Sequence, residues 1–269
     1  MNALCLIYWT SNFSNVFLSA GSNADINKEM NTFDPLYKIH NAYRLGQIPQ
    51  KVYDLIMKRF PLVMDGIKRV EEASGLNYPY YYAEPSLVVS ISAVEFTEMG
   101  ILFARTIPVV DVHKQLHVVV QITAPLICYG LKGTIHAILA HEFMHYLELI
   151  NRILKMKVIS DDVSSTLFEG TYADATRLVE ERAVFKSDPT LIRHIITRFP
   201  EGFRDLKLEE KAIKMWMNKG LPTSKVSLDA NIIKIPIEAM ACLNVEQDVK
   251  DKITEFENIK LKKKKTSYV

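Results

Sequence analysis

Gly133–Ile150 reads GTIHAILAHEFMHYLELI, and this apolar stretch is the strongest indication of the fold in the sequence. Its apolar side chains recur at the three- and four-residue spacing of a helix, and neither proline nor glycine interrupts the run after Gly133. The pattern predicts a strongly apolar helix over residues 133–152, in the middle of the chain.

Two histidines and a glutamate stand within this apolar stretch. His141 and His145 are four residues apart, so on a helix both imidazoles project from one face and two ring nitrogens can reach one metal ion. Glu142 is rotated by about 100° from His141, and its carboxylate can reach a water on the metal without being a ligand. This H-E-x-x-H arrangement is typical of zinc hydrolases. The alternative is a buried helix with two hydrogen-bonded core histidines, but burying such groups without a function is costly.

The composition places limits on the kind of protein. The 269 residues suit one large domain or two small ones, and a net charge of +2 gives no electrostatic case for nucleic acid or an anionic membrane as a partner. No run of eighteen apolar residues predicts a membrane span. The scattered Cys5, Cys128 and Cys242 form no C-x-x-C pair, which favours reduced thiols in a cytoplasmic protein. The oligomeric state is left open.

The two ends of the chain differ from its middle. Residues 1–29 are expected to be a dispensable extension, because Met30 opens a plausible native start. A secretion signal ending near Ala20 is the less favoured interpretation, since the segment lacks a basic start and contains Asn, Ser and Thr. Residues 30–260 are expected to form a single domain, and residues 261–269 a basic tail.

Residues 30–130 are expected to contain a sheet with two covering helices. The predicted helices are Pro49–Phe60 and Pro61–Glu72. The predicted strands are Ser86–Ala93, Gly100–Val110 and Gln115–Thr123, with Asn77–Pro85 as an extended connection. Pro108 favours an edge or a bend in the second strand. The third strand leads into the apolar helix; it could pair with an extended peptide or be an ordinary internal strand.

Residues 131–260 are expected to be mainly helical. The predicted helices after the apolar one are Thr171–Lys186, 190–199, Leu206–Asn218, Asp229–Cys242 and Val245–Lys260. Ser187-Asp188-Pro189 has the residue types of a helix N-cap followed by proline in the first turn. Neither an internal repeat nor a low-complexity linker divides the chain, so the fold class is predicted to be one α+β unit.

A catalytic zinc site needs a third protein ligand. The extended motif with a third histidine fails, because positions 148 and 151 hold Glu and Asn. The candidate carboxylates are Glu148, Glu169, Asp174, Glu180 and Glu181. Glu148 would have to reach across seven residues of helix to share an ion with His141. Glu180 falls within the predicted helix 171–186, which could hold it rigidly, and Ala183 is small enough to let two helices approach.

The combination of HEFMH at 141–145 with a downstream Glu180-x-x-Ala183 resembles the gluzincin metallopeptidases. The resemblance covers two short motifs and the order of strand before helix. It implies a zincin-like fold, one Zn²⁺ held by His141, His145 and Glu180, and Glu142 as the general base. Val184 departs from the family pattern, which has Asp or Asn there to support a ligand histidine. Asp174 or Glu169 would then have to supply that support.

The implied reaction is hydrolysis of a peptide bond in a peptide or protein substrate. Zinc would polarise the carbonyl and activate a water, and Glu142 would take the proton of that water. Candidate oxyanion donors are Tyr129, Tyr146, Tyr172, Arg177 and Arg182. The alternative from another class is a non-catalytic metal-binding regulatory or scaffold protein, although a purely structural site would not need Glu142.

Overall fold

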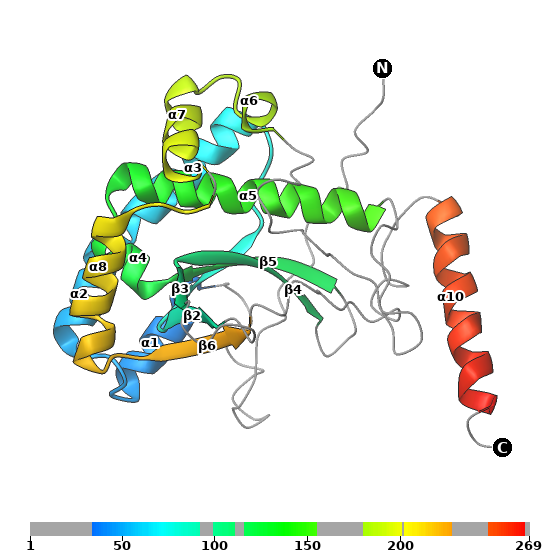
Figure 1. The fold of residues 1–269 in the computed structure, drawn as a ribbon, viewed down its shortest axis with the longest axis horizontal. Coiled ribbons are helices and arrows are strands. Elements are labelled where there is room, and N and C mark those ends of the chain that lie inside the picture. Colours follow the sequence, from blue (N-terminus) through cyan, green and yellow to red (C-terminus); the bar gives the residue numbers. More distant parts are fainter. Residues whose placement is uncertain are drawn as a thin grey trace.

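The computed structural model describes residues 34–91, 99–110, 116–154, 180–200, 202–227 and 247–266. In this part the protein has an α+β fold with two small sheets (Figure 1), as the sequence predicts. Several predictions fall outside the described residues: the extension 1–29, the helix 229–242, most of the helix 171–186, and the side chains of Cys5, Glu169, Tyr172, Asp174, Arg177 and Cys242. None of the described helices is both long enough and apolar enough to cross a membrane.

The central element is helix α5 (Lys132–Leu154), which confirms the helix predicted around HEFMH. It packs against α3 (Pro61–Ser74) and α7 (Pro189–Arg198), and it also contacts strand β4 (Ala104–Val110), so that α5 lies between helices and a sheet (Figure 1). The apolar side chains of α5 are therefore enclosed from several directions, which explains why the stretch is hydrophobic almost all round.

The first sheet has the strand order β1-β5-β4. Its central strand β5 (Leu116–Thr123) is buried along its whole length, runs parallel to β1 (Tyr80–Glu84) and antiparallel to β4. The strand that leads towards α5 is thus the internal strand of this sheet rather than an exposed edge. Strand β4, which contains Pro108, lies at the edge of the described sheet, in agreement with the tendency of proline to avoid central strands.

The second sheet has the order β3-β2-β6. Strand β2 (Leu87–Ile91) is antiparallel to β3 (Met99–Leu102) and parallel to β6 (Thr223–Ser227), which the sequence did not predict. The strand predicted at 100–110 is in fact two strands in different sheets. The break falls at Phe103, whose carbonyl accepts hydrogen bonds from both the backbone N–H and the hydroxyl of Thr123.

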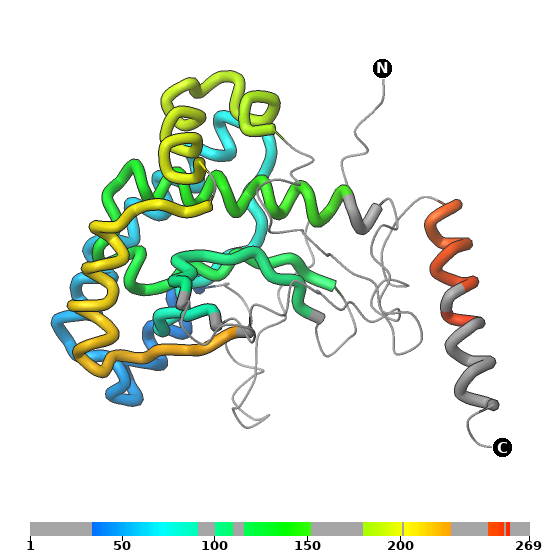
Figure 2. Tube along the Cα trace, viewed as in Figure 1, coloured from blue at the N-terminus to red at the C-terminus, as the bar shows by residue number. Residues whose placement is uncertain are grey.

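The N-terminal helices α2 (Gln50–Arg59) and α3 confirm the predicted pair, and Gly75 ends α3 in the left-handed conformation at φ 71°. Helices α1 (Tyr37–Arg44) and α4 (Ala124–Tyr129) were not predicted. Helix α4 packs between α2 and α8 (Leu206–Met215), so segments far apart in the sequence meet at one end of the molecule (Figure 2).

Two predictions about the C-terminal half need correction. Glu180 was expected inside the helix 171–186, but its backbone is extended (φ −90°, ψ 134°) and it precedes the single-turn helix α6 (Glu181–Val184). The basic run near the C-terminus belongs to helix α10 (Gln247–Thr266), which continues past the predicted end at residue 260. Asp188, by contrast, caps α7 from its side chain, with proline in the first turn, as predicted.

Candidate metal centre

His141 and His145 lie side by side on α5 with their ring nitrogens facing one another. The two Nε2 atoms are 2.9 Å apart and the rings are almost perpendicular, at 89°. Both side chains are buried. In a tetrahedral zinc site, with Zn–N distances of about 2.0–2.1 Å, two ligand nitrogens are about 3.3 Å apart. The two imidazoles therefore fit a shared metal ion after a separation of only about 0.4 Å.

Glu142 is buried against the sheet, next to the histidine pair. The hydroxyl of Thr106, on the edge strand β4, lies 2.8 Å from Glu142 Oε2 and 2.9 Å from the Glu142 carbonyl oxygen. The rotation of about 100° between successive helix positions turns Glu142 away from the direction of His141 and towards β4. The carboxylate is thus held against β4 by a group that comes from a different part of the chain.

An aromatic ring covers one face of His141. Phe199, at the C-terminal end of α7, stacks on the imidazole with 3.7 Å between ring centroids and only 6° between planes. Phe203 contacts Phe199, and Phe103 contacts Phe203, so an aromatic chain extends from His141 to the point where β3 and β4 separate. This packing fixes the plane of the His141 ring.

Tyr78 contacts α5 close to the HEFMH stretch. Its hydroxyl donates to the Leu139 carbonyl at 2.9 Å, and its ring stacks on Phe143. Burial raises the pKa of Tyr78 well above its ordinary value, and the negative charge of Glu142 adds to this effect. Tyr78 is therefore a neutral phenol that holds α5 rather than a group that titrates.

The described candidates for the oxyanion donor differ in position. Tyr129 donates to the Met215 carbonyl and contacts the edge of Trp216, so it serves the packing of α4 on α8. Tyr146 is partly buried near Phe143, and burial raises its pKa. Arg182 is exposed on α6. Tyr146 is the described candidate that shares a helix with the histidine pair.

The third ligand is not brought to the histidines in the described part of the chain. No group of three or more His, Cys, Asp and Glu side chains that could hold a metal forms among the described residues. Glu180 is exposed, whereas Glu148, one turn beyond His145, is buried. Val184 packs against an apolar cluster of α5 and α7. This packing accounts for an apolar residue at that position.

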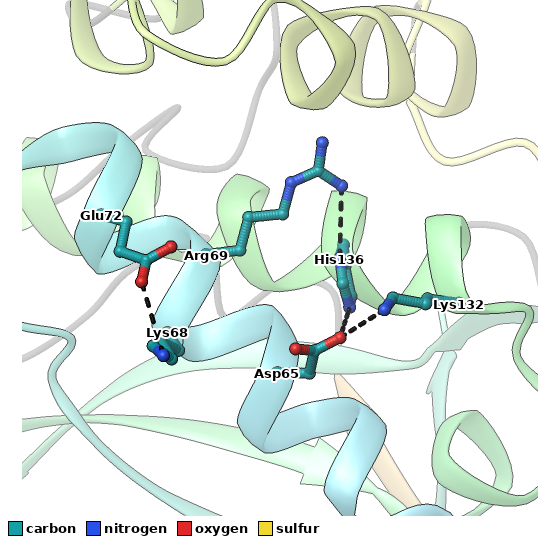
Figure 3. A pocket seen from close by; sticks show the side chains of 6 residues that line it. All are labelled: Asp65, Lys68, Arg69, Glu72, Lys132 and His136. Carbon is teal, nitrogen blue, oxygen red and sulfur yellow. Dashed lines mark hydrogen bonds and ion pairs between the residues drawn. The ribbon is translucent and has the colours of Figure 1, made fainter.

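A second polar cluster, between α3 and α5, surrounds His136 (Figure 3). Arg69 of α3 donates to His136 Nδ1 at 3.3 Å and also binds both carboxylate oxygens of Asp188, while His136 Nε2 lies 3.9 Å from Asp65. Burial lowers the pKa of His136, and the cations of Arg69 and Lys132 lower it further. Since five helix positions correspond to a rotation of about 140°, His136 faces away from His141 and ties α5 to α3 and α7.

Three residues of the site region were missed at the sequence level: Thr106, Phe199 and His136. Thr106 and Phe199 reach α5 from β4 and from the end of α7, and no local pattern in the sequence marks such long-range contacts. His136 is visible as a histidine on an apolar helix, and its position off the HEFMH face was the signal that it has a different role.

Comparison of the chain with protein-family models, with curated proteins and with solved structures finds no match. The resemblance to gluzincins therefore stays a prediction, based on residues 141–145 and 180–183.

Proposed function

We propose that this protein is a zinc-dependent metallopeptidase with a zincin-like fold. The observation that carries the proposal is the convergence of His141 Nε2 and His145 Nε2 at 2.9 Å, on a helix where the adjacent residue Glu142 is also buried. Two imidazoles that face one position supply two donors of the kind zinc prefers, and a carboxylate one residue away can serve as the general base.

Each residue then has a distinct role in the reaction. His141 and His145 would hold the metal through Nε2, and the stacked Phe199 keeps the His141 ring in the required plane. Zinc, when bound, supplies a Lewis acid that lowers the pKa of a coordinated water towards about 7. Glu142 accepts a proton from that water and delivers it to the amine that leaves when the peptide bond breaks. Burial of Glu142 keeps this proton transfer away from bulk solvent.

Glu180 is the proposed third ligand on the strength of the resemblance. Its carboxylate is exposed at the start of α6, whereas Glu148 is buried on α5 itself. The two assignments are separated by measuring the zinc content of Glu180→Ala and Glu148→Ala after equilibration with limiting zinc. A loss of zinc in Glu180→Ala supports the assignment, and retention of zinc there with loss in Glu148→Ala rejects it.

The proposal is tested with purified protein, a measurement of bound metal and a pool of quenched fluorescent peptides. We expect one zinc per chain in the wild type, loss of zinc in His145→Ala, and normal zinc with loss of hydrolysis in Glu142→Gln. A wild-type chain that binds no zinc contradicts the proposed metal site. A Glu142→Gln variant that cleaves peptides at the wild-type rate contradicts the role of Glu142.

The second candidate is a non-catalytic metal-binding regulatory or scaffold protein. The observation in its favour is the contact of Glu142 with Thr106, which also has the character of a structural hydrogen bond between helix and sheet. Under this alternative, the wild type binds zinc and cleaves no peptide. Glu142→Gln then changes only stability.

A further inference from the structure

A buried hydroxyl of β4 joins this strand to α5. Thr106 is 1% exposed, and its Oγ1 lies within hydrogen-bonding distance of two oxygens of the same residue, the carbonyl and the carboxylate Oε2 of Glu142. A threonine hydroxyl carries a single proton, so the two acceptors share it. The contact therefore constrains the backbone of Glu142 and the rotamer of its side chain together.

The sheet fixes the position of Thr106, and the Thr106 hydroxyl in turn orients the Glu142 carboxylate. Thr106 stands opposite Val120 in the β4–β5 ladder, so its position is fixed by the sheet and not by α5. A buried carboxylate needs hydrogen-bond donors, because its unpaired charge is costly away from water. The hydroxyl donates to one carboxylate oxygen and thereby limits the orientations that the Glu142 carboxylate can adopt.

We propose that Thr106 is a positioning residue for the general base of the site. Its hydroxyl holds Glu142 Oε2 against β4, so that the carboxylate is ordered before substrate binds. This inference rests on the proposed peptidase function and deepens it, because it makes the edge strand part of the catalytic geometry. Preorganisation of this kind matters because a displacement of about 1 Å in a catalytic group costs about 100-fold in rate.

The chain provides a matched control in Thr123. This threonine is also 1% exposed and lies in the same sheet, but its hydroxyl donates at 2.8 Å to the carbonyl of Phe103. Thr123→Val removes a buried hydroxyl of the same kind without touching Glu142. Thr106→Val removes the contact to Glu142 at nearly constant volume, and Thr106→Ser keeps the hydroxyl while deleting a methyl group.

The first experiment measures kcat, KM and zinc content for these variants with a peptide that the wild type cleaves. We expect Thr106→Val to lower kcat by about 10- to 100-fold with little change in KM or in zinc. Thr106→Ser should restore most of kcat, and Thr123→Val should keep kcat per folded molecule. A Thr106→Val variant with wild-type kcat, or an equal loss in Thr123→Val, overturns the inference.

A second experiment does not depend on activity. The thermal midpoints of Thr106→Val, Glu142→Ala and the double variant are compared in the metal-free protein, with Thr123→Val and Glu142→Ala as the reference pair. We expect the Thr106 and Glu142 shifts to be less than additive and the reference shifts to add. If the wild type cleaves no peptide, the proposed function fails and this cycle alone decides the contact, with additive shifts overturning it.

Discussion

Asp188 supplies two kinds of stabilisation that substitution can separate. Its carboxylate accepts from the Leu191 N–H at 2.9 Å as the N-cap of α7, and it pairs with Arg69 through contacts of 2.5 and 2.9 Å. Asparagine is as good an N-cap as aspartate, so Asp188→Asn keeps the cap and removes the negative charge. Asp188→Ala removes both. The difference between the two variants isolates the cap from the ion pair.

The magnitudes follow from the exposure of the pair. A hydrogen bond to a charged group contributes about 1.5–3 kcal/mol. The Arg69 and Asp188 side chains are 25% and 21% exposed, so solvent screening reduces this figure. We expect Asp188→Asn to lower the free energy of unfolding by about 1–2 kcal/mol. Loss of the cap costs about 1 kcal/mol more, so Asp188→Ala should lose about 2–3 kcal/mol.

The assay is urea unfolding of the metal-free protein followed by far-ultraviolet circular dichroism at pH 7 and at lower pH. The hydrogen bond from Arg69 holds the pKa of Asp188 below its usual range. The folded pKa is therefore lower than the unfolded one, so the stabilisation is present above the unfolded pKa and is lost as the pH falls through the folded pKa. Equal stability of Asp188→Asn and the wild type at pH 7 would refute the role of the ion pair, and equal losses in the two variants would refute the cap.

Three further predictions concern the surroundings of α5. Gly66→Ala places a Cβ 2.7 Å from Leu139 Cδ1 and 2.9 Å from His136 Cδ2. This overpacking costs about 1–3 kcal/mol and outweighs a gain in helix propensity of about 1 kcal/mol. The thermal midpoint should therefore fall, and a higher midpoint would contradict the close approach. Burial lowers the pKa of His136 in the folded protein. The contribution of neutral His136 to the free energy of unfolding is therefore complete above the unfolded pKa of about 6.5 and declines as the pH falls towards the folded pKa. His136→Asn should flatten this decline in urea titrations between pH 5 and 8, and an unchanged slope would exclude His136 as its source. Phe199→Leu removes the ring stacked on His141, worth about 0.5–1.5 kcal/mol, and should weaken zinc binding about 2- to 10-fold in competition titrations; unchanged affinity would show that the stack does not orient the ligand.

Much of the fold was predictable because it depends on local patterns. The long apolar helix, the pair α2–α3, strand β5 and the Asp188-Pro189 start of α7 each have a clear period or a cap. Strand β6 and helix α4 were missed for physical reasons. β6 is the short segment TSKVS, whose strand character comes from pairing with β2, and α4 is a single short helix that continues from a buried strand.

The candidate site was predictable only where its residues lie close together in sequence. His141, Glu142 and His145 are fixed relative to one another by the geometry of a single helix, and the structure brings the two histidines together as that geometry requires. A third ligand depends on how a distant segment packs, which no helical period determines. Glu180 is an example, because its backbone is extended although the residues around it have high helix propensity.

The histidines of α5 illustrate how burial and function are related. His136 is buried and has a structural explanation, because Arg69 donates to its Nδ1 and links it to Asp188. His141 and His145 instead direct their Nε2 atoms at one another, at a hydrogen-bonding distance of 2.9 Å. These two nitrogens are the atoms that would hold the proposed metal ion, each through its lone pair. Departures from a simple apolar core are most readily explained at functional sites, and the proposed metal binding would explain this pair on α5.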